Sequence, residues 1–279
     1  MSNTIAFIGA GNMARSLIGG LVASGQPAAT ICATDPNPEQ RAQISATFGI
    51  QAYADNTTAI AQADTVVLAV KPQVMRDVAE TLASTVQARR PLVLSIAAGI
   101  RAADLENWLG GSLPLVRCMP NTPALIQSGA TGLYANPRVS AEQRQRAQDI
   151  MATAGITVWV DDESLLDAVT ALSGSGPAYF FLVMEALEQA GEKMGLEASV
   201  ARQLALHTAL GAAKMAIASD EGPAQLRTRV TSPGGTTERA ISILQQGDLE
   251  ALFERALQGA KTRCQELSDQ LGNATGDSA

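Results

Sequence analysis

The feature that most constrains the fold is an apolar run that leads directly into a glycine cluster near the N-terminus. Residues 5–8 read Ile-Ala-Phe-Ile, residues 9–14 read Gly-Ala-Gly-Asn-Met-Ala, and a helical spacing of leucine and isoleucine follows. A strand, a GxGxxA turn and a helix in this order are typical of a βαβ unit that binds a dinucleotide. We therefore expect a pyrophosphate at the start of the first helix.

The small residues of this turn have separate roles. Gly9 permits the tight turn, Gly11 lets the backbone approach the pyrophosphate, and Ala14 allows close packing of the helix on the strand. The alternative is an ordinary strand–turn–helix glycine cluster. If the glycine turn does bind a nucleotide, it indicates the class of ligand but not the reaction.

The N-terminal half alternates strand-like and helical segments. After residues 4–8, the strand-like runs are residues 30–34, 66–70, 92–96, 115–118 and 156–160. Runs that are apolar throughout indicate strands covered on both faces, and hence a mainly parallel sheet. Helix starts are indicated by Asn37 before Pro38, by Pro72, and by Ser140. We predict a Rossmann-like, doubly wound α/β domain over residues 1–162.

The second half reads as helical, because alanine-rich segments with helical spacing replace the strand-like runs after residue 163. Helices are expected over residues 165–172, 178–194, 199–218, 237–246 and 249–271. We predict an all-α domain over residues 163–271 and a disordered tail over residues 272–279. Residues 178–218 are apolar around the whole helix, which favours a subunit interface over a plain buried helix.

Length and charge exclude several classes of protein. A chain of 279 residues is long for a single core, and 20 basic against 27 acidic residues give a net charge of −7. This charge disfavours nucleic acid and anionic lipid as partners. Cys32, Cys118 and Cys264 lie far apart without a CxxC motif, so we expect a reducing compartment, the cytoplasm, and no metal cluster. We expect neither secretion nor a membrane span.

The end of the second strand bears on the choice of nucleotide. Asp35 lies 26 positions after Gly9, where an acidic residue often accepts from the ribose hydroxyls and disfavours a 2′-phosphate. Its place before Pro36 and Asn37 equally suits a turn or capping residue. Arg41, one helical turn later, could meet a phosphate. Both NAD(H) and NADP(H) therefore remain candidates.

Other strand ends are expected at the same edge of the sheet, because open α/β sheets hold ligands at the carboxyl ends of their strands. Lys71 follows the run 66–70, and residues 96–99 follow the next strand. In residues 119–123, Asn121 and Thr122 stand between two prolines and could present donors to a nicotinamide or a substrate. The alternatives are a solvated lysine and a rigid crossover turn.

Two glycine-containing turns with hydroxyl groups open helices in the second half. They are residues 173–177, Ser-Gly-Ser-Gly-Pro, and residues 230–238, Val-Thr-Ser-Pro-Gly-Gly-Thr-Thr-Glu. Backbone N–H groups in such turns can hold a small carboxylate, with Thr237 aimed at the reacting centre. The alternative is a simple helix cap.

Taken together, these motifs resemble those of the pyrroline-5-carboxylate reductase family. The matching segments are residues 7–13, 69–72, 119–124, 172–179 and 230–237. They follow one another in the family's order from residue 4 to about residue 268, which is nearly the whole chain. The last segment is far more specific than the glycine turn.

The resemblance implies hydride transfer from NAD(P)H to the C=N carbon of 1-pyrroline-5-carboxylate, giving L-proline in the last step of proline biosynthesis. The implied and expected cofactor-binding residues are Gly9, Ala10, Gly11, Asn12, Met13, Ala14, Asp35, Asn37, Asn56, Ala69, Val70, Lys71, Pro72, Ile96, Ala97, Ala98 and Asn121. The implied substrate-binding residues are Glu163, Ser232, Gly234, Gly235, Thr236 and Thr237.

The resemblance also implies dimers interlocked through the C-terminal helices, with larger rings as a further assembly. In the family, the turn after the second strand usually carries serine, threonine or asparagine, often with NADPH. Asp35 departs from this pattern.

For the mechanism, we expect the protonated imine to accept the hydride, with the protein supplying alignment and charge placement. Thr237 is expected to hydrogen-bond the ring nitrogen, and the N–H groups around Gly234, Gly235 and Thr236 to fix the carboxylate. No catalytic histidine is needed, and His207 lies within a helical segment as a packing or surface residue.

Two rival functions remain. A β-hydroxyacid dehydrogenase has a similar two-domain plan but places a catalytic lysine after a glycine-rich segment, and residues 175–180 contain no lysine. A non-enzymatic nucleotide sensor would bind the cofactor without turnover.

Overall fold

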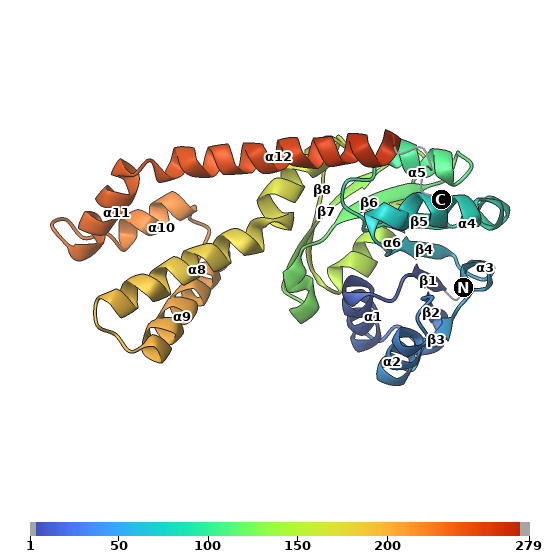
Figure 1. Cartoon of the computed structure of the whole chain (residues 1–279), viewed down its shortest axis with the longest axis horizontal. Helices are drawn as coiled ribbons and strands as arrows, with labels where there is room; N and C mark the ends of the chain where they lie inside the picture. The colour runs from blue at the N-terminus through green and yellow to red at the C-terminus, as the bar shows by residue number, and fades with distance from the viewer. Residues whose placement is uncertain (1–3, 274–279) are drawn as a thin grey trace. The chain divides into compact units, whose positions relative to one another are not determined.

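The computed structural model describes residues 4–273, and its N-terminal part is built on one eight-stranded sheet (Figure 1). The strands are β1 (Ile5–Ile8), β2 (Ile31–Thr34), β3 (Gln51–Tyr53), β4 (Thr65–Leu68), β5 (Leu92–Ser95), β6 (Leu115–Met119), β7 (Gly129–Ala135) and β8 (Gly155–Trp159). Their order is β3-β2-β1-β4-β5-β6-β7-β8, and β6 with β7 is the one antiparallel pair of this described sheet. The predicted doubly wound, mainly parallel sheet is confirmed.

Helices cover both faces of the sheet. They are α1 (Asn12–Ala23), α2 (Pro38–Phe48), α3 (Asn56–Ile60), α4 (Met75–Arg89), α5 (Ala102–Trp108) and α6 (Ala141–Ala152). Alternate residues of β1 enter separate cores: Phe7 packs with α1, α2 and α6, whereas Ile8 packs with α3, α4 and α5. This is why β1 is apolar at every position.

Two of these strands are missing from the sequence prediction. β3 has only three residues and lies at the edge of the sheet. β7 contains glycines where neighbours leave no room for a side chain: a Cβ on Gly129 would lie 2.8 Å from the Ala154 carbonyl oxygen, and one on Gly132 would lie 2.6 Å from Cγ1 of Val169. Because close packing requires glycine at these positions, β7 lacks the β-branched residues by which a strand is recognised in a sequence.

The predicted helix starts are formed. The side chain of Asn37 accepts a hydrogen bond from the Glu39 N–H at 2.8 Å, and Pro38 occupies the first turn of α2. Ser140 and Gln143 form a reciprocal capping box at the start of α6. Pro72 opens the short 3₁₀ turn η2 (Pro72–Val74) that precedes α4.

The helix predicted over residues 165–172 is formed in two pieces. α7 (Leu165–Val169) is followed by the π-helical segment η4 (Thr170–Gly174), in which the Ser175 N–H donates to the Thr170 carbonyl at 2.8 Å. At Gly174 a Cβ would lie 2.6 Å from Cε of Met119, so this segment packs closely against the end of β6.

The chain divides into two compact units, one of residues up to 175 together with those from 260 onward, and one of residues 176–259. The second unit contains α8 (Gly176–Lys193), α9 (Ala198–Ile217), α10 (Pro223–Arg229), α11 (Thr236–Gln246) and the first part of α12 (Leu249–Asn273). The boundary predicted between residues 162 and 163 falls inside the first unit.

Two sequence predictions need correction here. α10 was missed, because no helix is predicted between residues 218 and 237, although Pro223 after Gly222 suits a helix N-terminus. The predicted disordered tail begins too early, since Gly272 and Asn273 belong to α12, and Gly272 lies against Asp104. Residues 274–279 of that tail lie outside the described residues. Within residues 4–273, no helix combines the length and apolar character needed to cross a bilayer.

Candidate active site

The strand order reverses between β1 and β4, and in open α/β sheets the ligand crevice lies at such a switch point, outside the carboxyl ends of the strands. Gly9 follows β1, and its N–H donates to the Thr34 carbonyl at 2.9 Å. Ala69 follows β4, and its N–H donates to the Ile8 carbonyl at 2.8 Å. These bonds place the glycine turn and the segment after β4 side by side.

The two glycines of this turn are required for different reasons. Gly9 has φ +102°, and a Cβ there would lie 2.7 Å from the Ala69 carbonyl oxygen. At Gly11, which directly precedes α1, a Cβ would have no heavy atom within 4 Å. The space at the start of α1 is therefore open, and the first-turn N–H groups, which have no intrahelical acceptor, are accessible to an anion.

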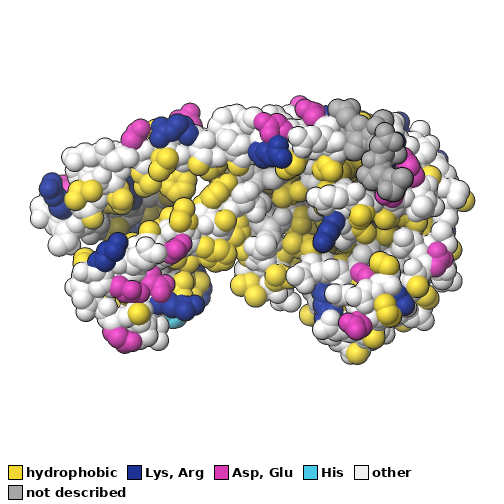
Figure 2. Space-filling model, viewed as in Figure 1, with side chains coloured by type: hydrophobic (Ala, Val, Ile, Leu, Met, Phe, Trp, Pro, Cys, Tyr) yellow, Lys and Arg dark blue, Asp and Glu magenta, His cyan; other side chains and the backbone are white. Residues whose placement is uncertain are grey.

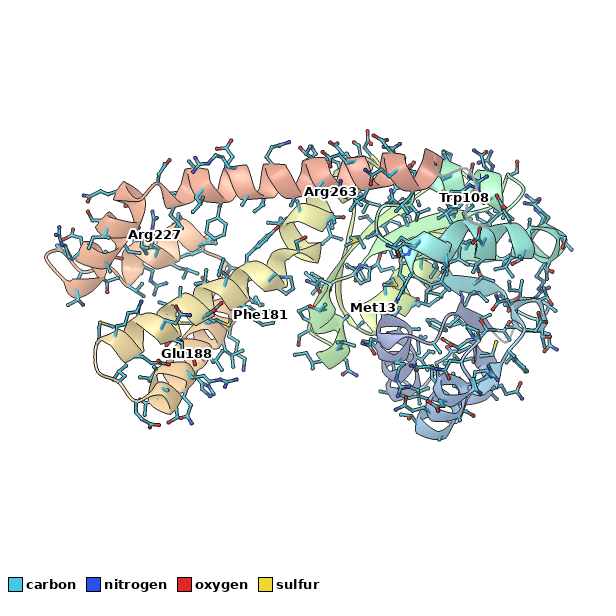
Figure 3. The ribbon with its side chains drawn as sticks, viewed as in Figure 1. Met13, Trp108, Phe181, Glu188, Arg227 and Arg263 are labelled. Atoms are coloured by element: carbon cyan, nitrogen blue, oxygen red, sulfur yellow. The ribbon has the colours of Figure 1, made fainter. Side chains whose placement is uncertain are left out.

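The remaining residues of the turn behave as the motif predicts. Ala14 is 1% exposed and packs in the core beneath the sheet edge, whereas Asn12 is exposed at the first position of α1. Met13, labelled in Figure 3, is half-buried on the same turn. In this motif Ala14 is packed in the core, while the first residue of α1, Asn12, is exposed to solvent.

Asp35 links the glycine turn to the turn after β2. Its carboxylate accepts from the Ala10 N–H at 3.1 Å and from the Asn37 N–H at 2.9 Å. Arg41 donates from Nη1 to the carbonyls of Asp35 at 2.7 Å and Pro36 at 2.9 Å. Asp35 therefore has the capping role considered for it. Its carboxylate and the guanidinium of Arg41 both bond to the turn after β2.

Asn56 is at the first position of α3, three residues after the last residue of β3. Asp55 caps this helix: its carboxylate accepts from the Thr57 hydroxyl, the Thr58 hydroxyl and both backbone N–H groups. These bonds, with the Thr57 hydroxyl first, lower the pKa of Asp55. The carboxylate fixes the local backbone and leaves Asn56 half-buried at this end of the sheet.

The segments after β4 and β5 lie next to each other. The Ile96 N–H donates to the Leu68 carbonyl at 3.2 Å, which holds the turn after β5 against the end of β4. Lys71 is exposed, while Ala97 is 6% exposed. Residues 69–72 and 96–98 therefore share the carboxyl edge with the glycine turn, as the sequence predicts.

The side chain of Asn121 has a structural role that the sequence did not indicate. Nδ2 donates to the Ser173 carbonyl at 3.1 Å and to its Oγ at 3.4 Å, and Oδ1 accepts from the Ala130 N–H at 2.9 Å. The donors that we expected to face a nicotinamide or substrate are thus bonded within the protein. Asn121 joins the turn after β6 to η4.

Glu163, which belongs to the first unit, is held by two hydrogen bonds within that unit. Its Oε1 accepts from Nη1 of Arg117 at 2.7 Å and from the Ala102 N–H at the start of α5 at 2.6 Å. The Arg117 side chain is only 8% exposed, so this is a partly buried ion pair. Burial, and then the charge of Glu163, raise the pKa of Tyr134 nearby.

The glycine turn of the second unit has a defined geometry. The Gly235 N–H donates to the Ser232 carbonyl at 3.0 Å, with Pro233 and Gly234, φ +71°, at the two central positions. This is a type II turn, which needs a residue with positive φ at its third position. Glu238 accepts from the Gly234 N–H at 2.7 Å.

α11 begins directly after this turn, at Thr236. The N–H groups of Gly234 and Gly235, which we expected to bind a carboxylate, donate instead to the Glu238 carboxylate and to the Ser232 carbonyl. The first-turn N–H groups of Thr236, Thr237 and Glu238 have no intrahelical acceptor. The anion-binding potential therefore lies at the start of α11, where Thr237 is half-buried.

A hollow of about 320 Å³ lies beside this turn, between α10 and α11. It is lined by Arg227, Thr228, Thr231, Glu238, Ile241, Ser242 and Gln245. Glu238, which braces the turn, is therefore also part of the wall of the hollow.

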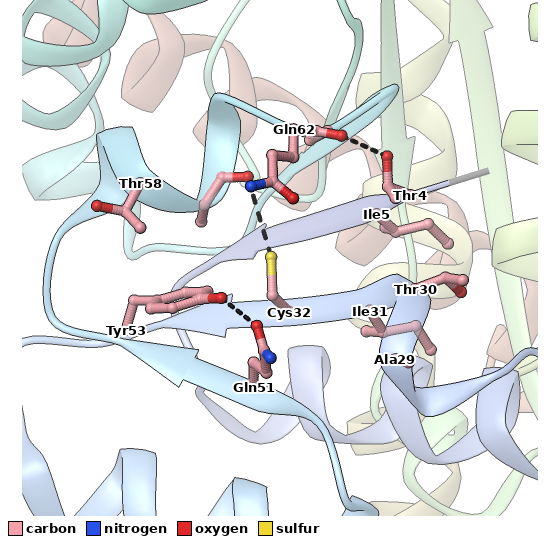
Figure 4. A pocket seen from close by; sticks show the side chains of 12 residues that line it. Thr4, Ile5, Ala29, Thr30, Ile31, Cys32, Gln51, Tyr53, Thr58 and Gln62 are labelled. Carbon is pink, nitrogen blue, oxygen red and sulfur yellow. Dashed lines mark hydrogen bonds between the residues drawn. The ribbon is translucent and has the colours of Figure 1, made fainter. Parts of the chain in front are cut away.

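A smaller cavity lies away from the nucleotide edge, around the amino ends of β1 and β2 (Figure 4). Cys32 lines it, and burial raises the pKa of this thiol to about 11. A thiol that stays protonated is a poor nucleophile. This cavity is therefore not part of the candidate site.

Family models match both parts of the chain. Residues 4–99 match "NADP oxidoreductase coenzyme F420-dependent", and residues 163–267 match "Pyrroline-5-carboxylate reductase dimerisation". The first match covers the glycine turn with Asp35 and residues 69–72, and the second covers the type II turn. The dimerisation match supports a homo-oligomer.

Whole-length relatives carry one name. The pyrroline-5-carboxylate reductase of Pseudomonas aeruginosa is 58% identical over 268 residues, which are 96% of this chain and 98% of that protein. The structure of the Coxiella burnetii pyrroline-5-carboxylate reductase matches with a TM-score of 0.93 and 44% identity over 96% of this chain and 99% of that one. The Plasmodium falciparum enzyme with NADP bound matches with a TM-score of 0.83 and 27% identity over 96% and 99% of the two chains. The chain therefore belongs to the pyrroline-5-carboxylate reductase family.

Proposed function

We propose that the chain reduces 1-pyrroline-5-carboxylate to L-proline with hydride from a nicotinamide nucleotide, the final step of proline biosynthesis. The observation that carries the proposal is that one chain holds both required parts. The glycine turn fits a dinucleotide, because Gly9 lies too close to the Ala69 carbonyl for any side chain and the space next to Gly11 is open. The start of α11 fits a small carboxylate. The whole-length relationship to enzymes of this name supports it.

The nucleotide, when bound, supplies the hydride. The chain's part is to bind and orient it: the start of α1 holds the pyrophosphate, Asp35 and Asn37 lie where the ribose of the adenosine is bound, and Asn56 lies beside them. Residues 69–72 and 96–98 line the same edge toward the nicotinamide. Asn121 contributes by fixing the turn after β6 through Ser173.

The balance between NADH and NADPH depends on two opposite charges at one turn. Asp35 disfavours a 2′-phosphate by charge repulsion, while the guanidinium of Arg41, bound to the Asp35 carbonyl, attracts it. The family model for residues 4–99 and the P. falciparum structure both name NADP. We propose that both cofactors are accepted and that Asp35 shifts the preference toward NADH.

The substrate is bound through its carboxylate by the first-turn N–H groups of α11. Ser232, Gly234 and Gly235 shape the turn that presents these groups, and the hydroxyl of Thr237 hydrogen-bonds the ring nitrogen. The protonated imine is the better hydride acceptor, so a fixed negative charge assists the reaction. We propose Glu163 as a further substrate-binding residue; Arg117 and the Ala102 N–H hold its carboxylate in place.

Assembly is proposed to use the helical unit. Figure 2 shows hydrophobic side chains over this unit, and on α8 they include Phe180, 67% exposed, and Phe181, 64% exposed, the latter labelled in Figure 3. Such exposure of large apolar side chains marks an interaction surface. We propose a homodimer or a larger assembly through these helices. The free state of Cys32, Cys118 and Cys264 supports a cytoplasmic location.

A direct assay tests the reaction. Purified protein is mixed with NADPH or NADH and 1-pyrroline-5-carboxylate, and the absorbance of the reduced nicotinamide is followed together with the formation of L-proline. We expect proline in amounts equal to the cofactor oxidised. Cofactor binding without turnover would instead identify a nucleotide sensor. In a separate assay, reduction of NAD⁺ or NADP⁺ by a β-hydroxyacid, with no proline formed in the first assay, would identify the rival dehydrogenase.

A further inference from the structure

The side chain of Glu238 connects the first turn of α11 to the glycine turn that precedes the helix. Gly235 is the N-cap of α11, so Glu238 is the third helical residue. In a capping box, a carboxylate at this position accepts from the N–H of the N-cap residue. Here the Gly235 N–H donates to the Ser232 carbonyl at 3.0 Å. Glu238 accepts instead from the Gly234 N–H at 2.7 Å, so its bond fixes the backbone one residue before the N-cap.

The two glycines make this junction costly to order. Gly234 has φ +71°, and a Cβ on Gly235 would lie 3.0 Å from the Ser232 carbonyl oxygen, so the turn favours glycine at both positions. Glycine loses more conformational freedom on ordering than any other residue. The bond from Gly234 to Glu238 restrains this segment before a ligand arrives. A ligand that binds there then has less ordering to impose.

The restrained segment leads directly into the N–H groups to which the proposed function assigns the substrate carboxylate. These are the first-turn groups of α11, including those of Thr236 and Thr237, which have no intrahelical acceptor. Such groups bind an anion well only if they already point to one place. The direction of the first turn depends on how the glycine turn enters it, and Glu238 holds that entry.

The charge of Glu238 acts against the same ligand. A carboxylate on the first turn of α11 repels a second carboxylate that binds there. The benefit of Glu238 to the substrate therefore comes from its hydrogen bond and not from its charge. A neutral side chain makes a comparable bond in the same unit, since Oε1 of Gln225 accepts from the Gly222 N–H at 3.0 Å at the start of α10.

We propose that Glu238 is a positioning residue for the substrate. By accepting from the Gly234 N–H, it holds the glycine turn so that the first-turn N–H groups of α11 converge on the substrate carboxylate. Glu238 acts through the backbone and takes no part in hydride or proton transfer. This inference rests on the proposed function, which places the carboxylate at the start of α11.

Steady-state kinetics with 1-pyrroline-5-carboxylate test the role of the bond. Glu238→Ala is expected to raise the KM for this substrate about tenfold and to change kcat less than about threefold, because the bond supports the bound substrate and the transition state equally. Glu238→Gln is expected to restore the KM, since it keeps an acceptor and removes the repelling charge. The KM for the nucleotide is expected to stay within about twofold in both variants.

Gln225→Ala is the matched control, because it removes the comparable bond at the start of α10. It is expected to leave the KM for 1-pyrroline-5-carboxylate unchanged. A parental KM in Glu238→Ala, or an equal rise in Glu238→Gln or in Gln225→Ala, would overturn the inference. An inactive parent would overturn the proposed function and this inference with it, whereas an active parent with these variant results would overturn the inference alone.

Hydrogen exchange measures the bond without any substrate. In Glu238→Ala the Gly234 amide is expected to exchange at least about threefold faster than in the parent, while the Gly222 amide keeps its rate. In Gln225→Ala the two responses are expected to be exchanged. An unchanged rate for Gly234 in Glu238→Ala would show that the bond does not hold the turn, and it would overturn the inference whatever the outcome of the reductase assay.

Discussion

The side-chain amide of Asn121 joins the turn after β6 to the π-helical segment η4, by donating to the carbonyl oxygen of Ser173 at 3.1 Å and to its Oγ at 3.4 Å. Asn121→Asp keeps an acceptor for the Ala130 N–H but replaces the donor with a negative charge beside two oxygens. We expect the free energy of unfolding to fall by about 1–3 kcal/mol and kcat to fall with it. Chemical denaturation and steady-state kinetics measure the two effects.

Ser173→Ala is the control for this pair, because it removes the hydroxyl but keeps the carbonyl bond to Asn121. It is expected to cost less than about 1 kcal/mol. An Asn121→Asp protein as stable as the parent would show that the amide bond does not hold η4 in place.

The two glycines of the nucleotide turn are expected to respond differently to alanine. Gly9→Ala brings a Cβ within 2.7 Å of the Ala69 carbonyl at φ +102°, so it is expected to destabilise the first unit by more than about 2 kcal/mol. Gly11→Ala meets no heavy atom within 4 Å, so stability is expected to stay within about 1 kcal/mol of the parent.

Nucleotide affinity separates the roles further. The methyl group of Gly11→Ala enters the space through which we propose that the pyrophosphate approaches, and titration of cofactor fluorescence is expected to show at least about tenfold weaker binding. Unchanged affinity of Gly11→Ala would place the pyrophosphate elsewhere.

The carboxylate at the end of β2 is expected to set cofactor preference. Asp35→Ser removes a negative charge from the turn that also carries Arg41, so the ratio of kcat/KM for NADPH to that for NADH is expected to rise about tenfold. Asp149→Asn makes the same change of charge on the exposed surface of α6 and is expected to leave the ratio unchanged. No change in the ratio for Asp35→Ser would mean that this carboxylate does not face the 2′-phosphate.

The hydroxyl of Thr237 is expected to act in the transition state. Thr237→Ala is expected to lower kcat/KM by about ten- to a thousandfold, the loss of one positioned hydrogen bond. Thr237→Ser retains the hydroxyl and is expected to restore most of the activity. Equal activity of the alanine and parent proteins would remove Thr237 from the mechanism.

Cys32 makes a testable contribution to the pH dependence of stability. Burial raises the pKa of this thiol from 9.0 to about 11, so between these values the unfolded chain releases a proton that the folded chain retains. The stabilisation is fully present below pH 9 and is lost as the pH rises to about 11. Because the thiol is partly exposed, the loss is expected to be on the order of 1–2 kcal/mol.

The comparison that isolates this thiol is between the parent and Cys32→Ala, since tyrosines and lysines also titrate in this range. Urea denaturation at pH 8, 9, 10 and 11 is expected to show a smaller loss of stability in the variant. Parallel curves for the two proteins would contradict the assignment.

The sequence predicts the strands that are continuously apolar and misses those whose residues were selected for close contact. β1, β4 and β5 each read as buried because helices cover both faces. β7 is the contrary case, since its glycines accommodate Val169 and Ala154. These packing requirements come from segments that are distant in the sequence, so the local pattern of apolar residues does not reveal them.

The same limit applies to the site. The GxGxxA turn is predictable because the requirement at Gly9 arises within a βαβ unit of known geometry. The bond of Asn121 to Ser173 and that of Glu163 to Arg117 are not, because in each pair the two residues are more than 40 positions apart. A signal did exist for Asp35, whose position before Pro36 suits a turn, and the structure shows the carboxylate bonded at that turn.

The last helix has a consequence for how this chain can be dissected. The part of α12 from residue 260 onward belongs to the first compact unit, where Asp269 pairs with Arg101 at 2.6 Å and Leu271 lies against Gly99. A recombinant fragment ending at residue 175 would therefore lack the C-terminal part of α12 that packs against it. A synthetic peptide of residues 260–273 is the natural complement to such a fragment, so that a split-protein reconstitution would recover the nucleotide-binding half without the oligomerising helices.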